Sequence, residues 1–431
     1  MQNLRLLNEA TDTPQQYPEN QQNTYMKVAF IVNKFPALSE TFILNQITGL
    51  IDNGHDVDIF ANFVSDDSKI HADVKKYNLI DKTYYFHIPN TRIDRVEYAI
   101  KICLENLISH LLSLLKFAKL FQTKNVYQSL NNLFLLKPFL NKQYDIIHCH
   151  FGTIGKDYLF LKELLNVKYV TTFHGYDITM VLQKNGINYY NDLMENGDLF
   201  LPISDNWKRK LIEMGCGEEK IIVHRMGINT DYFKFQPRRI KHNEKIKLLT
   251  IARLAEKKGI KFAIQAVAKV LQKYPNLEYR IAGDGLLMND LHNLIMNLGV
   301  QNKISLLGWM THSEVQNLME QAHLFILPSV TSLNGDQEGI PVVLMEAQAV
   351  GLPVVSTWHS GISELVVDGK SGFLVPERDV EALAERLQYL IEHPGVWAKM
   401  GRCGRNFVEE HYDIKKLNQQ LVNIYQNLQI S

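Results

Sequence analysis

The most informative acidic residues of this chain are Glu338 and Glu346, which stand eight positions apart in the stretch EGIPVVLME. Gly339 and Pro341 place the first acid in a loop, and Pro341 suits the first position of a helix that carries the second acid. Free backbone N–H groups at the start of such a helix can bind an anion or the polar edge of a sugar. Glu338 would then hold hydroxyl groups at the helix mouth, and Glu346 would reach a second group deeper in a cleft. In the alternative interpretation, Glu338 only complements the helix dipole and Glu346 is a solvated surface residue.

Two cations follow a predicted strand at residues 246–253. Arg253 and Lys258 stand in the turn between this strand and a predicted helix, in the stretch RLAEKKG. Cations at such a turn can neutralise a diphosphate, whose negative charge grows as a glycosidic bond to it breaks. We expect Lys257 to be solvated. An ordinary solvated helix start is the alternative, and it would be favoured for any isolated Lys-Lys-Gly.

Four further positions have weaker signals. Gly283 ends another predicted strand in the turn GDG, where glycine's backbone freedom is a sufficient explanation. His174 and Asp177 follow a predicted strand in HGYD, at the end of the strand where cleft residues gather in open α/β sheets. A lone histidine is more often structural. Glu40, in the stretch FPALSETF, would favour the positive end of a helix dipole after an N-cap at Ser39.

The elements that must position these residues form two separate β-α series. The first begins with VAFIVN, a continuous apolar run typical of a parallel strand buried on both faces. A polar, basic segment around residues 230–247 then precedes a second series of the same kind. We therefore predict an α/β fold with two Rossmann-like, doubly wound domains that face a cleft. The predicted boundaries are a disordered extension at 1–25, a first domain at 26–235 with a helical insert near 95–140, a second domain at 236–405, and a C-terminal helix at 406–431.

Composition excludes several classes of protein. The chain has 431 residues, which is too long for one ordinary core and suggests two domains. Its 46 basic and 46 acidic residues leave no net charge, which argues against a nucleic-acid binder. The four cysteines have no metal or redox spacing, and the sequence contains neither a secretory signal nor an apolar run of membrane-spanning length. We expect a cytoplasmic protein that needs no metal.

Several of these segments resemble motifs of retaining glycosyltransferase family 4, which has the GT-B fold. EGIPVVLME resembles the family's E-x7-E motif, and the likeness continues to residue 375. Ser360-Gly361 replaces the usual Gly-Gly. RLAEKKG resembles the R-L-x-x-x-K-G element, HGYD the cleft histidine motif, and FPALSETF a signature of exopolysaccharide transferases of the colanic acid and amylovoran types. The resemblance covers residues 26–409 and is weakest in the insert.

The resemblance implies roles for particular residues. Glu338 would contact the donor sugar and Glu346 the ribose of the nucleotide, while Arg253 and Lys258 would clamp the diphosphate. His174 would contact the sugar at the reacting centre. Residues implied to line the nucleotide-sugar site are Gly283, Gly308, Trp309, Gly339, Ile340 and Pro341, and those implied weakly for the acceptor are Glu40 and Asp177. The C-terminal helix would cross back to the first domain.

The resemblance thus implies a retaining glycosyltransferase that moves a hexose-type sugar from a UDP or GDP sugar to a glycan or lipid-linked acceptor in polysaccharide assembly. The nucleotide sugar is a co-substrate, and no cofactor is required. The amphipathic insert, with Lys101, Lys116 and Lys119, would lie on the inner face of the membrane or pack on the first domain. Two rival functions are a non-hydrolysing nucleotide-sugar epimerase, which converts the free sugar nucleotide, and a non-catalytic sugar-nucleotide-binding subunit.

Overall fold

The computed structural model describes residues 25–37, 40–65, 70–107, 126–242 and 244–430. The predicted extension lies outside the described residues apart from Tyr25, and so does the predicted N-cap Ser39.

The first half of the chain forms a six-stranded parallel sheet in the order β3-β2-β1-β4-β5-β6. Its central strand β1 is buried on both faces at residues 28–32, as the continuous apolar run predicts. The strands are β1 (Lys27–Phe35), β2 (Asp56–Val64), β3 (Thr83–Tyr85), β4 (Ile146–His150), β5 (Lys168–Phe173) and β6 (Leu199–Pro202).

The second half repeats the same topology, with a parallel sheet in the order β12-β11-β10-β7-β8-β9. Its strands are β7 (Ile246–Ile251), β8 (Leu277–Ala282), β9 (Ile304–Gly308), β10 (Leu324–Leu327), β11 (Val354–Thr357) and β12 (Gly372–Val375). In each sheet the strand order reverses at one point, between β1 and β4 and between β7 and β10. Ligand sites of open α/β sheets form at the carboxyl ends of strands at such points. The predicted fold class, two Rossmann-like domains, is confirmed.

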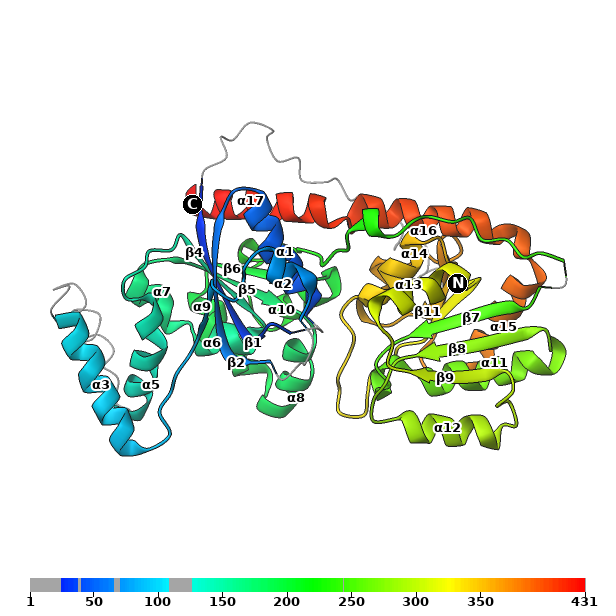
Figure 1. Cartoon of the computed structure of the whole chain (residues 1–431), viewed down its shortest axis with the longest axis horizontal. Helices are drawn as coiled ribbons and strands as arrows, with labels where there is room; N and C mark the ends of the chain where they lie inside the picture. The colour runs from blue at the N-terminus through cyan, green and yellow to red at the C-terminus, as the bar shows by residue number, and fades with distance from the viewer. Residues whose placement is uncertain (1–24, 38–39, 66–69, 108–125, 243, 431) are drawn as a thin grey trace.

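Helices cover both sheets, which lie side by side with the second on the right in Figure 1. Those of the first half are α1 (Thr41–Asp52), α2 (Ala72–Lys76), α3 (Arg92–Leu107), α5 (Val126–Leu136), α6 (Gly152–Asp157), α7 (Phe160–Leu165), α8 (Met180–Asn185), α9 (Asn191–Asn196) and α10 (Asp205–Glu213). Those of the second half are α11 (Ile260–Lys273), α12 (Met288–Asn297), α13 (His312–Gln321), α14 (Val342–Ala349), α15 (Val380–Glu392), α16 (Trp397–His411) and α17 (Ile414–Ile430).

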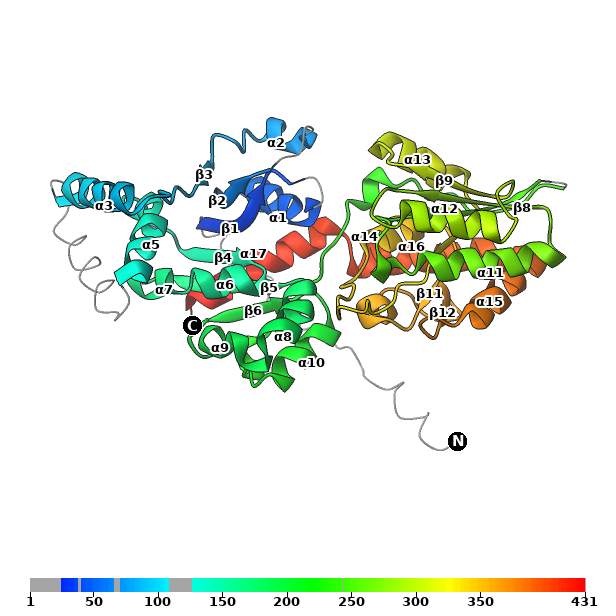
Figure 2. The ribbon, with the colours of Figure 1, turned by 90° about the horizontal axis from the view of Figure 1, so that it is seen from below.

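The last helix returns to the first sheet. Helix α16 packs on α14, the chain turns at residues 412–413, and α17 then runs along the first half (Figures 1 and 2). Leu421, Val422, Ile424 and Tyr425 of α17 belong to the core of the first half, and the Asn418 side chain donates to the Asn45 carbonyl of α1 at 3.1 Å. The crossing helix therefore begins at Ile414, later than the predicted boundary of 406.

The predicted helical insert is described in part, as α3 and α5. Helix α5 packs on the first sheet through Leu133 and Phe134, whereas α3 exposes an apolar row at the positions Ile93, Val96, Ile100 and Leu104. Residues 108–125, with Lys116 and Lys119, lie outside the described part of the chain, so contact of the insert with a membrane stays a prediction. No helix within the described ranges is long and apolar enough to cross a membrane.

Candidate functional site

The loop at residues 328–341, between β10 and α14, carries the first acid of the E-x7-E segment. Helix α14 begins at Val342, and Pro341 is its N-cap with extended backbone (φ −64°, ψ 117°). The prediction that Pro341 is the first helical residue was therefore wrong by one position, because the proline's fixed φ suits the preceding turn equally well. Glu346 lies one turn inside the helix, as predicted, and Glu338 lies in the loop.

Glu338 is buried and held between two ammonium groups. Its Oε2 accepts from Lys258 Nζ at 2.9 Å, and its Oε1 lies 3.7 Å from Lys257 Nζ. Lys257 also pairs with Asp336 at 3.0 Å, so the prediction that Lys257 is solvated was wrong. Burial alone would raise the pKa of Glu338, but the two lysines reverse the effect and hold the pKa below its usual value. Glu338 is therefore ionised at neutral pH.

The lysine pair reaches this loop because of the glycine that follows it. Gly259 has a positive φ of 62°, and a Cβ there would collide with the carbonyl oxygen of Pro328. The Val330 N–H also donates to the Lys257 carbonyl at 2.9 Å. Close backbone packing of the turn after β7 against the loop after β10 thus places both ammonium groups beside Glu338.

Next to this cluster lies an open cavity of about 450 Å³. It brings together six residues predicted for the nucleotide-sugar site, namely Arg253, Lys258, Gly283, Trp309, Pro341 and Glu346. Gly308 does not line the cavity, but its carbonyl accepts from the Gly283 N–H at 2.8 Å. Ile340 is buried in the core instead. A cation pair beside a helix N-terminus makes one wall of this cavity suited to an anion.

Glu346, on α14, is the carboxylic acid among the residues that line this cavity. Its side chain is half-buried and makes no hydrogen bond or ion pair within the described residues. Burial raises its pKa to about 7. The carboxyl group therefore changes its protonation state around neutral pH, and Glu346 is the residue predicted from the resemblance to bind the ribose.

Binding of a nucleotide sugar should consequently depend on pH. A ribose that donates to Glu346 requires the ionised carboxylate, so binding releases a proton and tightens as the pH rises through about 7. We expect the Kd to fall about tenfold between about pH 6 and 8, measured by titration calorimetry. In Glu346→Gln the Kd should be independent of pH over this range. An unchanged pH dependence in that variant would exclude Glu346 as the responsible group.

On the first-domain side, His174 follows β5 and is buried between the rings of Phe42 and Phe151, with ring centroids 4.7 and 4.6 Å away. Its Nε2 lies 3.0 Å from His150 Nδ1, and burial lowers the pKa of His174 to about 3. The ring is therefore neutral. His150, the last residue of β4, was not among the predicted site residues, although a histidine at the carboxyl end of a strand is an available signal in an α/β sheet.

Of the two residues with weakly predicted acceptor roles, Asp177 contacts the backbone of His174 directly. Asp177 is fully buried, and its carboxylate accepts backbone N–H groups of Gly152, His174 and Gly175 at 2.8–3.1 Å. These contacts orient the loop that carries His174. Glu40 is the N-cap residue of α1, two positions before Phe42, and burial raises its pKa to about 7.

The two halves of the site meet across the interdomain cleft. A Cβ on Gly339 would come within 2.6 Å of the His174 carbonyl oxygen, so these backbones pack directly together. Nearby, Glu364 accepts the N–H groups of Asp205 and Asn206 at the start of α10, both at 2.9 Å. A carboxylate of the second domain thus caps a helix of the first.

Ser360, which replaces the usual glycine, lies beside the interface of the two domains. Ser360 adopts the positive φ of 48° that a glycine would take at no cost, and its Oγ lies 3.4 Å from the Asn206 side-chain nitrogen across the cleft.

Two Rossmann-type sheets, with a basic cavity in the second domain and a buried histidine facing it from the first, are the arrangement of the GT-B fold, which many glycosyltransferases have. Residues 39–232 match the profile described as Glycosyltransferase Family 4, and residues 232–407 match that of Glycosyl transferases group 1. The chain belongs to glycosyltransferase family 4 and is a transferase of that kind.

Two of its relatives span most of the chain. WcaL of Salmonella typhimurium, assigned to colanic acid biosynthesis, is 39% identical over 412 residues, covering 94% of this chain and 100% of WcaL. The amylovoran biosynthesis glycosyltransferase AmsK of Erwinia amylovora is 38% identical over 416 residues, with the same coverage. Among solved structures, Anabaena HepE in complex with UDP and glucose shares the fold with a TM-score of 0.67 at 18% identity, covering 94% of this chain and 100% of HepE.

Proposed function

We propose that this glycosyltransferase acts in exopolysaccharide biosynthesis, moving a hexose-type sugar with retention of configuration from a UDP or GDP sugar to a glycan or lipid-linked acceptor. The observation that carries the proposal is the cavity between Arg253, Lys258 and Glu346, with the ionised Glu338 beside Lys258. The names of WcaL and AmsK support the process, and the UDP and glucose bound to HepE support a uridine nucleotide.

In the proposed reaction the diphosphate lies against Arg253 and Lys258, and the sugar extends towards Glu338. As the bond between the anomeric carbon and the phosphate oxygen breaks, negative charge grows on the diphosphate, and the two cations stabilise it. The acceptor oxygen forms the new bond on the face from which the diphosphate leaves, and its proton passes to the departing phosphate oxygen. Glu338, already ion-paired with lysines, holds sugar hydroxyls rather than acting as a nucleophile.

Thermal unfolding against a panel of UDP, GDP, ADP and TDP sugars, with EDTA present, tests this proposal. A ligand bound only by the folded state raises the apparent Tm, and about 100 Kd of ligand stabilises by ~2.7 kcal/mol. We expect nucleotides of one base to raise the Tm, and Arg253→Ala to weaken that shift. No shift with any nucleotide would contradict the proposal, and conversion of the free sugar nucleotide without an acceptor would favour an epimerase.

A further inference from the structure

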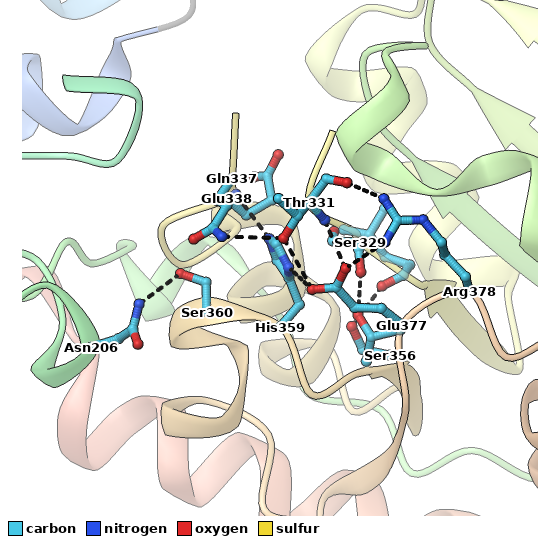
Figure 3. Close-up of polar contacts among 12 residues, drawn as sticks. Asn206, Ser329, Thr331, Gln337, Glu338, Ser356, His359, Ser360, Glu377 and Arg378 are labelled. Atoms are coloured by element: carbon cyan, nitrogen blue, oxygen red, sulfur yellow. Dashed lines mark hydrogen bonds and ion pairs between the residues drawn. The ribbon is translucent and has the colours of Figure 1, made fainter. Parts of the chain in front are cut away.

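We propose that His359 and Glu377 are positioning residues, which hold the loop of Glu338 so that its carboxylate can receive the donor sugar. The inference rests on the proposed function. Its starting observation is a chain of three groups in Figure 3: the Glu338 backbone N–H donates to His359 Nε2 at 3.1 Å, and His359 Nδ1 lies 2.6 Å from Glu377 Oε1.

The hydrogen bonds determine the tautomer of His359. A backbone N–H can only donate, so Nε2 must present its lone pair and carries no proton. The proton of the neutral ring is then on Nδ1, which donates it to Glu377. His359 is only 1% exposed, so solvent offers no substitute partner. If His359 Nε2 carried a proton, in the other tautomer or in the protonated ring, its N–H would face the backbone N–H of Glu338 and the hydrogen bond would be lost.

Glu377 holds the other end of the same loop. Its Oε2 accepts the Thr331 N–H at 2.9 Å, and Arg378 Nη1 lies 3.3 Å from the same oxygen. The Gln337 side chain donates to Thr331 Oγ1 at 3.2 Å, which joins the two ends of the loop (Figure 3). One carboxylate therefore fixes Thr331 directly and Glu338 through His359.

The anchoring comes from neighbouring strands of the second sheet. His359 follows β11 and Glu377 follows β12, and these parallel strands end at the same edge. Because both residues stand on this rigid edge, the loop residues 331–338 are tied to the sheet rather than only to one another. The pair lies outside the nucleotide cavity, whose lining residues come from other segments.

The two oxygen atoms of the Glu338 carboxylate differ in their hydrogen bonding. Glu338 Oε2 is occupied by Lys258, whereas Oε1 is buried and accepts no hydrogen bond within the described residues. A sugar hydroxyl would supply the missing donor. His359 binds the Glu338 backbone but does not line the cavity proposed for the diphosphate. Its loss should therefore weaken binding of the sugar and leave the affinity for the nucleoside diphosphate unchanged.

The test compares His359→Leu, His359→Gln and a matched control, His323→Leu. His323 is also a buried histidine of the second domain whose ring accepts a backbone N–H, from Lys247 at 3.0 Å, with a carboxylate 3.7 Å away. It stands at the opposite end of the sheet, before β10. The control therefore matches the loss of a buried ring and its hydrogen bond without touching the Glu338 loop.

Amide hydrogen exchange of the peptide covering residues 331–341 is the first readout, and it needs no ligand. We expect exchange in His359→Leu to be at least about tenfold faster than in the wild type and the control, with partial recovery in His359→Gln, whose amide oxygen can replace Nε2 as acceptor. Unchanged exchange would overturn the inference even if no nucleotide sugar were found to bind.

Calorimetric titration with UDP-glucose, GDP-mannose, UDP and GDP is the second readout. We expect His359→Leu to weaken binding of the sugar nucleotide about tenfold or more while the Kd of its parent diphosphate changes less than about twofold. An equal loss of affinity for the sugar nucleotide and its parent diphosphate, or no loss for either, would overturn the positioning role. Failure of every ligand to bind the wild type would count against the proposed function and leave the exchange experiment to decide on the loop.

Discussion

Replacing Glu338 with alanine is expected to lower kcat/KM for sugar transfer by about three orders of magnitude, the loss typical of removing a preorganised group that contacts the reacting sugar. Binding of the nucleoside diphosphate should survive. Lys257 and Lys258 lose an ion-pair partner in this variant, and Lys258 lines the cavity proposed for the diphosphate. The freed ammonium group should therefore keep the affinity for UDP or GDP equal to that of the wild type, or increase it.

Steady-state kinetics and titration with the free diphosphate would measure the two effects separately. Asp336→Ala is the matched control, because it removes the other carboxylate of the same ion cluster but keeps Glu338, the one proposed to contact the sugar. We expect this control to lose no more than about tenfold in kcat/KM. Turnover of Glu338→Ala at the wild-type rate would exclude Glu338 from the sugar site.

The second large effect is expected at Arg253 and Lys258, the two cations proposed to bind the diphosphate. Arg253→Ala and Lys258→Ala should each lower kcat/KM by about two to three orders of magnitude, since each removes a charge that in the proposed reaction stabilises the leaving diphosphate. Their effects on stability should differ. Arg253 is exposed and has no ion pair within the described residues, whereas Lys258 is the direct partner of the buried Glu338.

We therefore expect Arg253→Ala to unfold at the wild-type Tm and Lys258→Ala to be less stable, by about 1–3 kcal/mol, because a buried carboxylate loses its hydrogen bond. Arg253→Lys provides the control for charge, and it should recover only part of the activity, since an ammonium group cannot bind two phosphate oxygens in the manner of a guanidinium. Wild-type activity in Arg253→Ala would contradict the clamp.

The features that could be predicted from the sequence are those encoded by neighbouring residues along the chain. Continuous apolar runs such as residues 28–33 predict buried parallel strands, and proline and glycine around Glu338 predict a loop before a helix. The spacing of Glu338 and Glu346 therefore placed one acid before α14 and one inside it. Arg253 and Lys258 were predictable because they follow a strand end, where α/β sheets bind ligands.

The contacts that support these residues had no such signal. Lys257 pairs with Asp336 across 79 positions of sequence, and His359 connects Glu338 and Glu377 across 21 and 18 positions. These partners meet only because β7, β10, β11 and β12 end at one edge of the sheet. His359 lies in the stretch that resembles the family, but neither its spacing nor its neighbours Trp358 and Ser360 indicate which groups it contacts, so its role is visible only in the tertiary structure.

The return of α17 to the first sheet affects the order in which the molecule can be completed on the ribosome. Four apolar side chains of this helix, Leu421, Val422, Ile424 and Tyr425, fill the core of the first half, yet they are translated after every strand of the second half. All the strands and core helices of the second Rossmann unit have been synthesised before α17. The first unit keeps an apolar face uncovered until α17 has been synthesised. The half of the enzyme that is synthesised first is therefore the half that finishes folding last.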